Sequence, residues 1–498
     1  MIALRRSGVF LRARPEYVVA AALIVLLIVG SGAYGWHGDE LYFVVAGQHP
    51  AFGYPDQPLF TPLLVGFMNA LGGGSLVVVR LASAVGSAAT AVIVGAMAGQ
   101  LGGGPQARLI GSLSWAVGAV SIVTGHFVDT TTFDVLATAG VCSCLIVAIT
   151  KNSGRWMVAG GAVLGLGLLN KMVIGAVIAL VVLSMLAVGP RRIFATRYAA
   201  IAAGLAVVGA APYLIWQGLH GWPQVELVSG ISQSGTEGGS VGVIPFQILL
   251  VSPFLVAFWI AGIVRLFRAP DARPFRGFAI AYLVLIVLLI ASSGKAYYAA
   301  GLLPVLVAAG GVSLERWIAG RARALKITLT AVAMVLALAI NAVIGLPVIP
   351  ASALGSSIVE KLNPDAGSQV GWPSFMTAVD KAYTAIPTAE RNHAVILTFS
   401  YSEAGAVDKF GNTLGLPQAF SGHNGFAGWG PPTGTGPVVM VGYSIGSRVA
   451  AKFVDCRTIT HVDNHLGLNN DEQGQPILLC AHPRKSWAKF WPSLIHYQ

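Results

Sequence analysis

The stretch YVVAAALIVLLIVGSGAYG, residues 17–35, contains no charged residue and decides the class of this protein. A run of about 18–20 apolar residues is long enough to cross the hydrocarbon core of a membrane as a helix. A second such run, ITLTAVAMVLALAINAVIGLPVI, covers residues 327–349. The 498-residue chain is 55% hydrophobic and only 10% charged, whereas soluble domains have about 25% charged residues. These features predict a polytopic α-helical membrane protein.

Hydropathy predicts eleven membrane spans, of which the first is expected to be retained because it lacks a clear signal-peptide cleavage site. The least certain boundary lies at Lys171, between two short apolar runs. After residue 348 the hydropathy falls, so we expect a transmembrane module over 1–348 and a soluble domain over 349–498. The expected spans are 17–35, 76–98, 108–125, 132–150, 156–170, 172–188, 199–219, 244–267, 277–293, 298–314 and 328–348.

The basic residues predict the orientation, because cytoplasmic loops of membrane proteins are rich in Lys and Arg. With eleven spans, the N-terminus is then cytoplasmic and the C-terminal domain extracytoplasmic. The net charge of +11 mostly reflects this bias and does not indicate a nucleic-acid partner. The basic residues fall before the first span and in alternate loops: Arg5, Arg6, Arg12 and Arg14; Lys151 and Arg155; Arg191, Arg192 and Arg197; Arg265, Arg268, Arg273 and Arg276; Arg316, Arg321, Arg323 and Lys326.

The first external loop, Trp36–Leu64, has no Lys or Arg but carries three acids, Asp39, Glu40 and Asp56. Its prolines interrupt helices, and irregular backbone at membrane depth must line a cavity or be covered by protein. We therefore expect a cavity that opens toward the outer leaflet. Further ionisable residues on this side of the membrane part include Arg80, Asp129, Asp134, Lys171 and Lys295.

These residue types suit the transfer of a group from a phosphorylated lipid. A carboxylate can take the proton of an attacking hydroxyl, and Lys or Arg can bind the phosphate and stabilise it as it leaves. Charges within apolar segments are costly and usually mark pairing or function.

Simpler explanations stay open for most of these residues. Asp39 and Glu40 can be solvated loop residues, and Arg80 can extend to the interface. Lys171 can mark a helix end, whereas Asp134 lies inside an apolar run and is harder to explain. Tyr297 and Tyr298 can belong to an interfacial aromatic belt. His37, His49 and His126 lack the spacing of a zinc site, so whether a metal binds stays undecided.

Several segments resemble the GT-C glycosyltransferases of the protein O-mannosyltransferase and aminoarabinose-transferase type, glycosyltransferase family 39, in its largely uncharacterised bacterial branch. The resemblance covers nearly the whole chain in order. Its departures are GKAYYAAGLLP where YYLxPxxP is expected, and NKMVIG rather than NKYT. The matching segments are WHGDELYFVVAGQHPAFGYPDQPLFTPLL, LVVVRLASAVGSAATAVIVGAMAGQLGGG, HFVDTTTFDVLATA, LGLGLLNKMVIG, YLIWQGLHGWPQVELV, SSGKAYYAAGLLPVLVAAGG, YSEAGAVDKFG, LPQAFSGHNGFAGWGPP and KSWAKFWPSLIHY.

The resemblance implies transfer of a sugar from a polyprenyl monophosphate to an acceptor on the outer face of the cytoplasmic membrane. Asp39 and Glu40 match the acidic motif after the first span, and Asp134 matches the second acid, with Asp129 a weaker match. Lys295, Tyr297 and Tyr298 match the segment that holds the lipid phosphate, and Lys171 matches a lysine of the family. Asp39 would be the base of a direct, inverting displacement, while Arg80, Lys171 and Lys295 would neutralise the departing phosphate. No cofactor is required, and a divalent cation on the phosphate stays open.

The C-terminal domain is expected to be a small α/β domain. HAVILTFS, PVVMVGY and QPILLCAHP are predicted strands, and YSEAGAVDKFG is a predicted helix that ends at a left-handed Gly411. The loop SGHNGFAGWGPPTGTGP is either functional or a packed surface loop. Cys456 and Cys480 both lie in this domain, where a disulfide would persist, so we predict that they are bonded.

The alternative functions are a membrane transporter or lipid flippase, and a membrane-anchored scaffold. Transporters often contain inverted repeats, and the sequence shows none. A scaffold leaves Asp134 unexplained. The sequence does not identify the donor sugar, the oligomeric state or the acceptor, which in relatives is a lipid, a glycan or a protein.

Overall fold

The computed structural model describes residues 14–234 and 239–497, and these form two compact units. Of the described residues, the first unit comprises 14–30, 80–216, 231–234 and 239–346, and the second comprises 31–79, 217–230 and 347–497. The second unit thus combines the C-terminal residues with the expected first external loop. Three of the four N-terminal arginines, Arg5, Arg6 and Arg12, lie outside the described residues.

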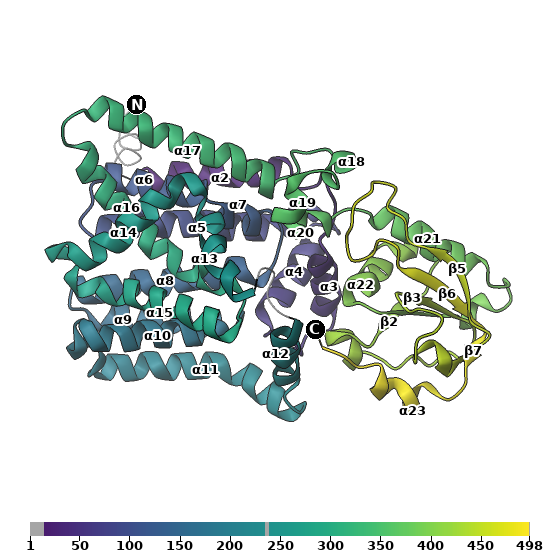
Figure 1. Cartoon of the computed structure of the whole chain (residues 1–498). Coiled ribbons are helices and arrows are strands. Elements are labelled where there is room, and N and C mark those ends of the chain that lie inside the picture. The colour runs from purple at the N-terminus through teal and green to yellow at the C-terminus, as the bar shows by residue number, and fades with distance from the viewer. Residues whose placement is uncertain (1–13, 235–238, 498) are drawn as a thin grey trace, which may run out of the picture. The chain divides into compact units, whose positions relative to one another are not determined.

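Apolar helices build the first unit, and α8, α9 and α10 pack side by side (Figure 1). Each of the eleven expected ranges coincides with one helix or one bent pair. The helices are α2 (Glu16–Val29), α5 (Leu76–Gln100), α6 (Pro105–Ala116), α7 (Ala119–His126), α8 (Thr130–Thr150), α9 (Gly154–Leu168), α10 (Val173–Val188), α11 (Arg197–Leu219), α13 (Gly239–Val251), α14 (Val256–Arg268), α15 (Arg276–Ser292), α16 (Leu303–Ile318) and α17 (Arg323–Gly345).

The number of spans that the helices support is smaller than eleven. Among the described residues, six helices are long and apolar enough to cross a membrane, and the total rises to eight if each bent pair is one span. Helices α2, α9 and α10 have 14, 15 and 16 residues, fewer than the ~20 that a span needs. The protein is therefore a multi-pass membrane protein, while the count of eleven stays a prediction.

The expected boundaries shift where glycine or proline ends a helix. Helix α2 stops at Val29 rather than at residue 35, because Gly30, Gly32 and Gly35 follow and glycine disfavours helix. Helix α17 stops at Gly345, two residues before Pro347. The expected break at Lys171 is present, since α9 ends at Leu168 and α10 begins at Val173.

The bend between α6 and α7 is 55° and frees a backbone carbonyl in an apolar surrounding. Asn341 of α17 donates its side-chain amide to the Val117 carbonyl at this break, at 2.7 Å. Because an unpaired carbonyl costs several kcal/mol (about 2–7) in an apolar medium, this contact explains how the bend is tolerated.

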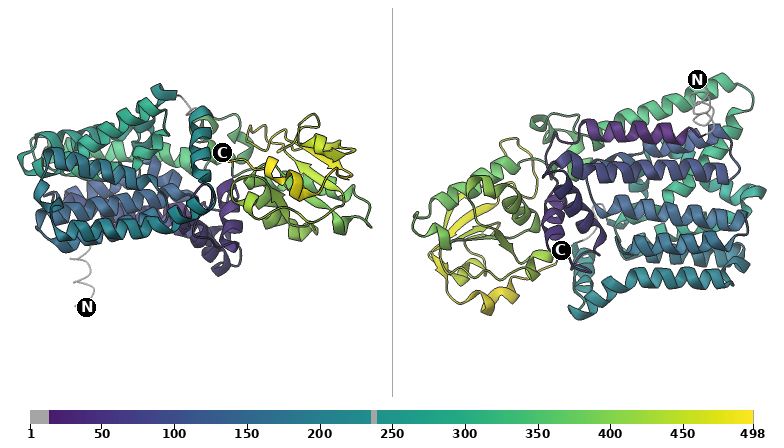
Figure 2. Two further views of the ribbon diagram at one scale, coloured as in Figure 1. Left: turned by 90° about the horizontal axis from the view of Figure 1, so that it is seen from below. Right: turned by 180° about the vertical axis from the view of Figure 1, so that it is seen from behind.

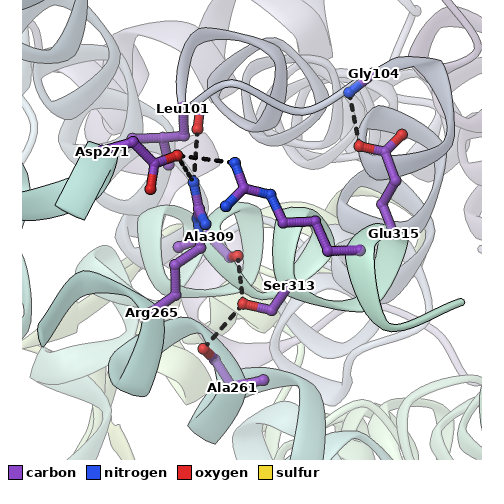
Figure 3. Close-up of polar contacts among 9 residues, drawn as sticks. Leu101, Gly104, Ala261, Arg265, Asp271, Ala309, Ser313 and Glu315 are labelled. Carbon is purple, nitrogen blue, oxygen red and sulfur yellow. Dashed lines mark hydrogen bonds and ion pairs between the residues drawn. The ribbon is translucent and has the colours of Figure 1, made fainter. Parts of the chain in front are cut away.

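A polar network ties together connections that the basic residues predict to be cytoplasmic (Figure 3). Arg265 donates to the Asp271 carboxylate at 2.6 Å and to the Leu101 carbonyl at 3.1 Å. Glu315 accepts from the backbone N–H of Gly104 at 2.8 Å. The charge-assisted bonds to Leu101 and Gly104 join segments more than 160 positions apart in the sequence.

The C-terminal part of the second unit is an α/β domain, as expected (Figures 1 and 2). Its mixed sheet has the strand order β2-β1-β3-β6-β5, with β1 parallel to β2 and β3. The predicted strands correspond to β1, β3 and β6. The strands are β1 (Val395–Thr398), β2 (Ala419–Ser421), β3 (Val438–Val441), β4 (Phe453–Val454), β5 (Arg457–His461), β6 (Pro476–Cys480) and β7 (His482–Pro483).

Helices cover both faces of this sheet. Helix α21 (Trp372–Thr384) packs on β3, β5 and β6, and α22 (Tyr401–Phe410) packs on β1 and β2. The other face buries Val395, Leu397, Val438 and Met440 against Trp487, Phe490 and Trp491. The remaining helices of the unit are α3 (Gly38–Gln48), α4 (Phe60–Leu71), most of α12 (Pro223–Ser234), α18 (Ala351–Leu354), α19 (Ile358–Leu362), α20 (Pro364–Gly367) and α23 (Trp487–Phe490).

One expectation for this domain is confirmed and another is wrong. Cys456 and Cys480 form a disulfide with their Cα atoms 4.0 Å apart. Gly411, however, has φ −65° and continues into a 3-10 turn, so it is not a left-handed cap. The left-handed residue is Gly415, with φ +69°, because the chain makes one tighter turn before it leaves the helix.

Candidate functional site

Asp39 and Glu40 occupy the first turn of helix α3, within the segment expected to be a loop. His37 caps this helix, because its Nδ1 accepts the backbone N–H of Asp39 at 3.1 Å. The Glu40 side chain turns back and accepts the backbone N–H of His37 at 2.9 Å. This reciprocal arrangement is a capping box. It leaves Glu40 fully buried and Asp39 half-buried, so the two acids have different surroundings.

Tyr401 holds the Asp39 carboxylate. It begins α22 and donates its hydroxyl to Oδ1 of Asp39 at 2.8 Å. Burial, together with the nearby Asp39 charge, raises the pKa of Tyr401 well above its ordinary value, so the phenol keeps its proton and donates. One carboxylate oxygen of Asp39 is thereby fixed within the second unit.

Two glycines allow α3 and α22 to approach closely. A Cβ atom added to Gly38 would lie 2.5 Å from the Ser402 hydroxyl, and one added to Gly405 would lie 2.8 Å from the Leu41 carbonyl carbon. Neither position has room for a side chain. Lys409, at the end of α22, donates to the side-chain carbonyl of Asn69 at 2.8 Å. The segment 36–79 and the C-terminal domain are therefore one packed body in this region.

Asp56 is a second carboxylate held by a tyrosine. The Tyr42 hydroxyl donates to Oδ1 of Asp56 at 2.9 Å and accepts the backbone N–H of Gly425 at 3.2 Å. The rings of Tyr42 and Tyr401 lie 4.8 Å apart. Burial raises the pKa of Asp56 to about 7, although the Tyr42 hydrogen bond acts in the opposite direction.

Aromatic rings from the glycine-rich loop complete this region. Trp429 stacks on His49 with the ring centroids 4.4 Å apart, and it contacts Tyr54 edge to face at 6.5 Å. Phe426 packs against Trp429 at 4.8 Å. The first part of the predicted loop is therefore packed against α3 and the residues that follow it.

The first unit contains a separate group around Asp134 and Lys171. Asp134, in α8, is 5% exposed, and its Oδ1 has no hydrogen-bond partner among the described residues. Lys171 donates to the Thr131 hydroxyl at 3.4 Å and interacts electrostatically with Asp134. Asp129, the weaker candidate, caps α8 by accepting the backbone N–H groups of Thr131 and Thr132.

Two tyrosines join the two lysines of this group. The Lys171 ammonium lies 5.0 Å from the Tyr297 ring centroid and 5.6 Å from that of Tyr298. The Lys295 ammonium lies 5.9 Å from the Tyr297 ring. Both lysines therefore make cation–π contacts with one ring. The structure brings together Asp134, which the sequence matched to the second catalytic acid, and the four residues assigned to the lipid phosphate: Lys171, Lys295, Tyr297 and Tyr298.

Arg80 has a different contact. It is fully buried in α5, and its guanidinium lies 3.4 Å from Nε2 of His126 in α7. The three histidines considered as metal ligands thus have unrelated roles: His37 caps α3, His49 stacks on Trp429 and His126 contacts Arg80. Among the described residues, no group of three or more His, Cys, Asp or Glu side chains could hold a metal ion.

Sequence reasoning missed Tyr401 and Tyr42 and gave Asp56 no role. The helix that Tyr401 begins was predicted, and Ser400 and Glu403 form its capping box. Its contact with Asp39, 362 positions away, has no local signal in the sequence.

The two groups can support different chemical steps. Asp39 has one oxygen fixed by Tyr401 and is half-buried, so it suits proton acceptance from a hydroxyl. Lys171 and Lys295, whose ammonium groups both contact the Tyr297 ring, suit the binding of a phosphate. Glu40 is held in its cap and is fully buried.

Comparison with known proteins identifies one family model and several similar folds. The family model for dolichyl-phosphate-mannose-protein mannosyltransferase matches residues 56–216. No curated protein sequence matches the chain significantly.

Solved structures give a more extensive match. ArnT from Cupriavidus metallidurans bound to undecaprenyl phosphate is similar with a TM-score of 0.62 and 15% identity, over 93% of this chain and 97% of that chain. The apo form of the same protein has a TM-score of 0.59 at 15% identity over the same shares. The arabinofuranosyltransferase AftD from Mycobacteria has a TM-score of 0.53 and 15% identity over 95% of this chain, which spans only 40% of AftD. The chain therefore has the fold that these proteins share.

Proposed function

We propose that this chain, whose resemblance to the GT-C glycosyltransferases is confirmed, transfers a sugar from a polyprenyl-phosphate donor to an acceptor hydroxyl. The hydrogen bond between Tyr401 and Asp39 is the observation that carries the proposal, because it fixes the position of one carboxylate that can act as the base. The resemblance to a protein bound to undecaprenyl phosphate supports a polyprenyl-phosphate donor.

In this proposal Asp39 takes the proton of the acceptor hydroxyl as its oxygen attacks the anomeric carbon of the sugar. The bond from that carbon to the phosphate oxygen breaks in the same step, and the electron pair leaves with the polyprenyl phosphate. A direct displacement of this kind inverts the anomeric configuration. Glu40 is a weaker candidate for the base because it is fully buried in the helix cap, whereas Asp39 is half-buried.

Lys171 and Lys295 bind the donor phosphate and stabilise the charge that it gains as the sugar departs. Tyr297 and Tyr298 orient the two ammonium groups. Asp134 holds Lys171 electrostatically. Arg80, fully buried beside His126, adds positive charge that stabilises the departing phosphate. The reaction needs no cofactor held by the protein, and a divalent cation would enter with the donor phosphate.

The orientation belongs to the same proposal. The acceptor, a lipid, glycan or protein, is used on the outer face of the cytoplasmic membrane, with the N-terminus cytoplasmic and the C-terminal domain extracytoplasmic. The distribution of basic residues supports this placement.

Purified protein in vesicles, given undecaprenyl phosphate that carries a radiolabelled sugar, tests the proposal. We expect release of undecaprenyl phosphate together with a labelled acceptor or free sugar. Movement of intact donor between leaflets without cleavage would instead support the transporter or flippase alternative.

A further inference from the structure

The C-terminal domain contains a groove formed by two adjoining cavities, far along the chain from Asp39. The larger has a volume of about 690 Å³ and the smaller about 390 Å³. Pro432, Thr433 and Thr435 line both cavities. We refer to the two together as the loop groove, because the second part of the glycine-rich loop, 431–435, forms their shared wall. Each cavity has the volume of a small-molecule site, for which the usual range is about 300–1,000 Å³.

The shared wall is held firmly in place. Trp487 donates its indole N–H to the Gly434 carbonyl at 2.7 Å. A Cβ atom added to Gly436 would lie 2.6 Å from the His393 carbonyl oxygen, so the loop lies directly on the chain before β1. Because this wall is already ordered, less conformational entropy is lost when a ligand binds.

One end of the groove is basic. His482, Arg484 and Lys485 line the larger cavity, and no Asp or Glu lines either cavity. Within 14–234 and 239–497, neither Arg484 nor Lys485 forms an ion pair with a carboxylate. The Arg484 backbone N–H donates to the Lys452 carbonyl at 2.8 Å, which fixes the segment that carries the cations. This end suits a carboxylate or phosphate.

The other end carries neutral hydrogen-bonding groups. Asn392, His393 and Gln418 line the smaller cavity, next to the hydroxyls of Thr433 and Thr435. Amides, hydroxyls and an imidazole both donate and accept, as sugar hydroxyls require. None of the lining residues is among the exposed large apolar side chains, which does not favour insertion into a lipid surface.

We propose that the loop groove binds an acidic oligosaccharide, with its carboxylates or phosphates at the His482, Arg484 and Lys485 end and neutral sugar units along Thr433, Thr435 and Gln418. This binding site goes beyond the proposed transferase reaction and does not depend on it.

Calorimetric titration of the full-length protein, in nanodiscs of zwitterionic lipid, tests the inference with three probes of known composition. Tetragalacturonate supplies an acidic oligosaccharide, maltotetraose a neutral one, and glycerophosphoglycerol the head group of an anionic lipid. We expect tetragalacturonate to bind about tenfold more tightly than either of the others, which is the scale of one charge-assisted hydrogen bond.

Matched variants assign the binding to the groove. Combining Arg484→Gln and Lys485→Gln should weaken tetragalacturonate binding about tenfold or more, and both side chains are exposed, so the fold should persist. Lys381→Gln removes an exposed cation of the same domain that lines neither cavity and should change nothing. Equal binding of the acidic and neutral oligosaccharides, no binding of either, or an unaffected double variant would overturn the inference. Tightest binding of glycerophosphoglycerol would overturn it in favour of a lipid head group.

Discussion

Changing Tyr401 to Phe removes one hydroxyl, the donor of the 2.8 Å hydrogen bond to Asp39. The ring itself should stay in place, because it packs 4.8 Å from the Tyr42 ring and 4.6 Å from the His423 ring. The variant therefore tests whether this single bond prepares Asp39 for catalysis.

The size of the effect follows from the type of bond and its exposure. A hydrogen bond to a charged group is worth about 1.5–3 kcal/mol, which corresponds to a factor of roughly 10–150 in rate. Asp39 is half-buried, so water can replace part of the lost bond. We therefore expect kcat to fall about tenfold, toward the low end of that range.

The assay measures initial rates of polyprenyl phosphate release at saturating donor. Tyr383→Phe is the matched control, because it removes a hydroxyl of the same domain that donates to the Arg391 carbonyl at 3.3 Å. The control should keep the wild-type rate. Combining Tyr401→Phe with Asp39→Asn should reduce the rate no further than Asp39→Asn alone, since both changes remove one interaction. A wild-type kcat for Tyr401→Phe, or an equal loss in the control, would refute the positioning role.

Three other predictions concern the phosphate, the pH dependence and the topology. Lys171→Met should weaken undecaprenyl phosphate binding about tenfold, while Lys151→Met, an exposed loop lysine, should not; equal affinities in both variants would place the phosphate elsewhere. Burial raises the pKa of Asp56 to about 7 and that of Glu472 to about 8. Both carboxyls therefore favour the folded state while they are protonated, and this contribution to the free energy of unfolding is lost as pH rises through those values. The thermal midpoint should then fall from pH 5 to pH 9, and Glu472→Gln should reduce that fall; a variant with the wild-type slope would contradict the assignment. A reporter at the C-terminus that is active only in the cytoplasm should be silent, and an active reporter would show that the orientation is wrong.

The sequence predicted the features that depend on long apolar runs, and the disulfide, for which only one pair of cysteines was available. The expected spans match helices because hydrophobic length is a strong local signal, whereas their number stayed uncertain where α2, α9 and α10 are short. The disulfide between Cys456 and Cys480 was predictable because only these two of the four cysteines lie in the C-terminal domain.

Other features depend on contacts between distant segments. Helix α3 was not expected, because it is buried on nearly all sides and shows no amphipathic pattern. The bonds from Tyr401 to Asp39 and from Gly425 to Tyr42 join residues more than 360 positions apart, and no local pattern specifies them. The left-handed position moved from Gly411 to Gly415 because a 3-10 turn extends α22.

The most direct test of the central claim compares Asp39→Asn with Glu40→Gln in turnover of the radiolabelled polyprenyl-phosphate sugar. Asp39→Asn keeps the shape of the side chain and removes its basic carboxylate, so the variant should bind the donor as wild type does but lose turnover by about 10²-fold or more. Glu40→Gln retains an oxygen that can accept the His37 N–H and should lose much less. Normal turnover by Asp39→Asn, or a greater loss in Glu40→Gln, would contradict the assignment of Asp39 as the base.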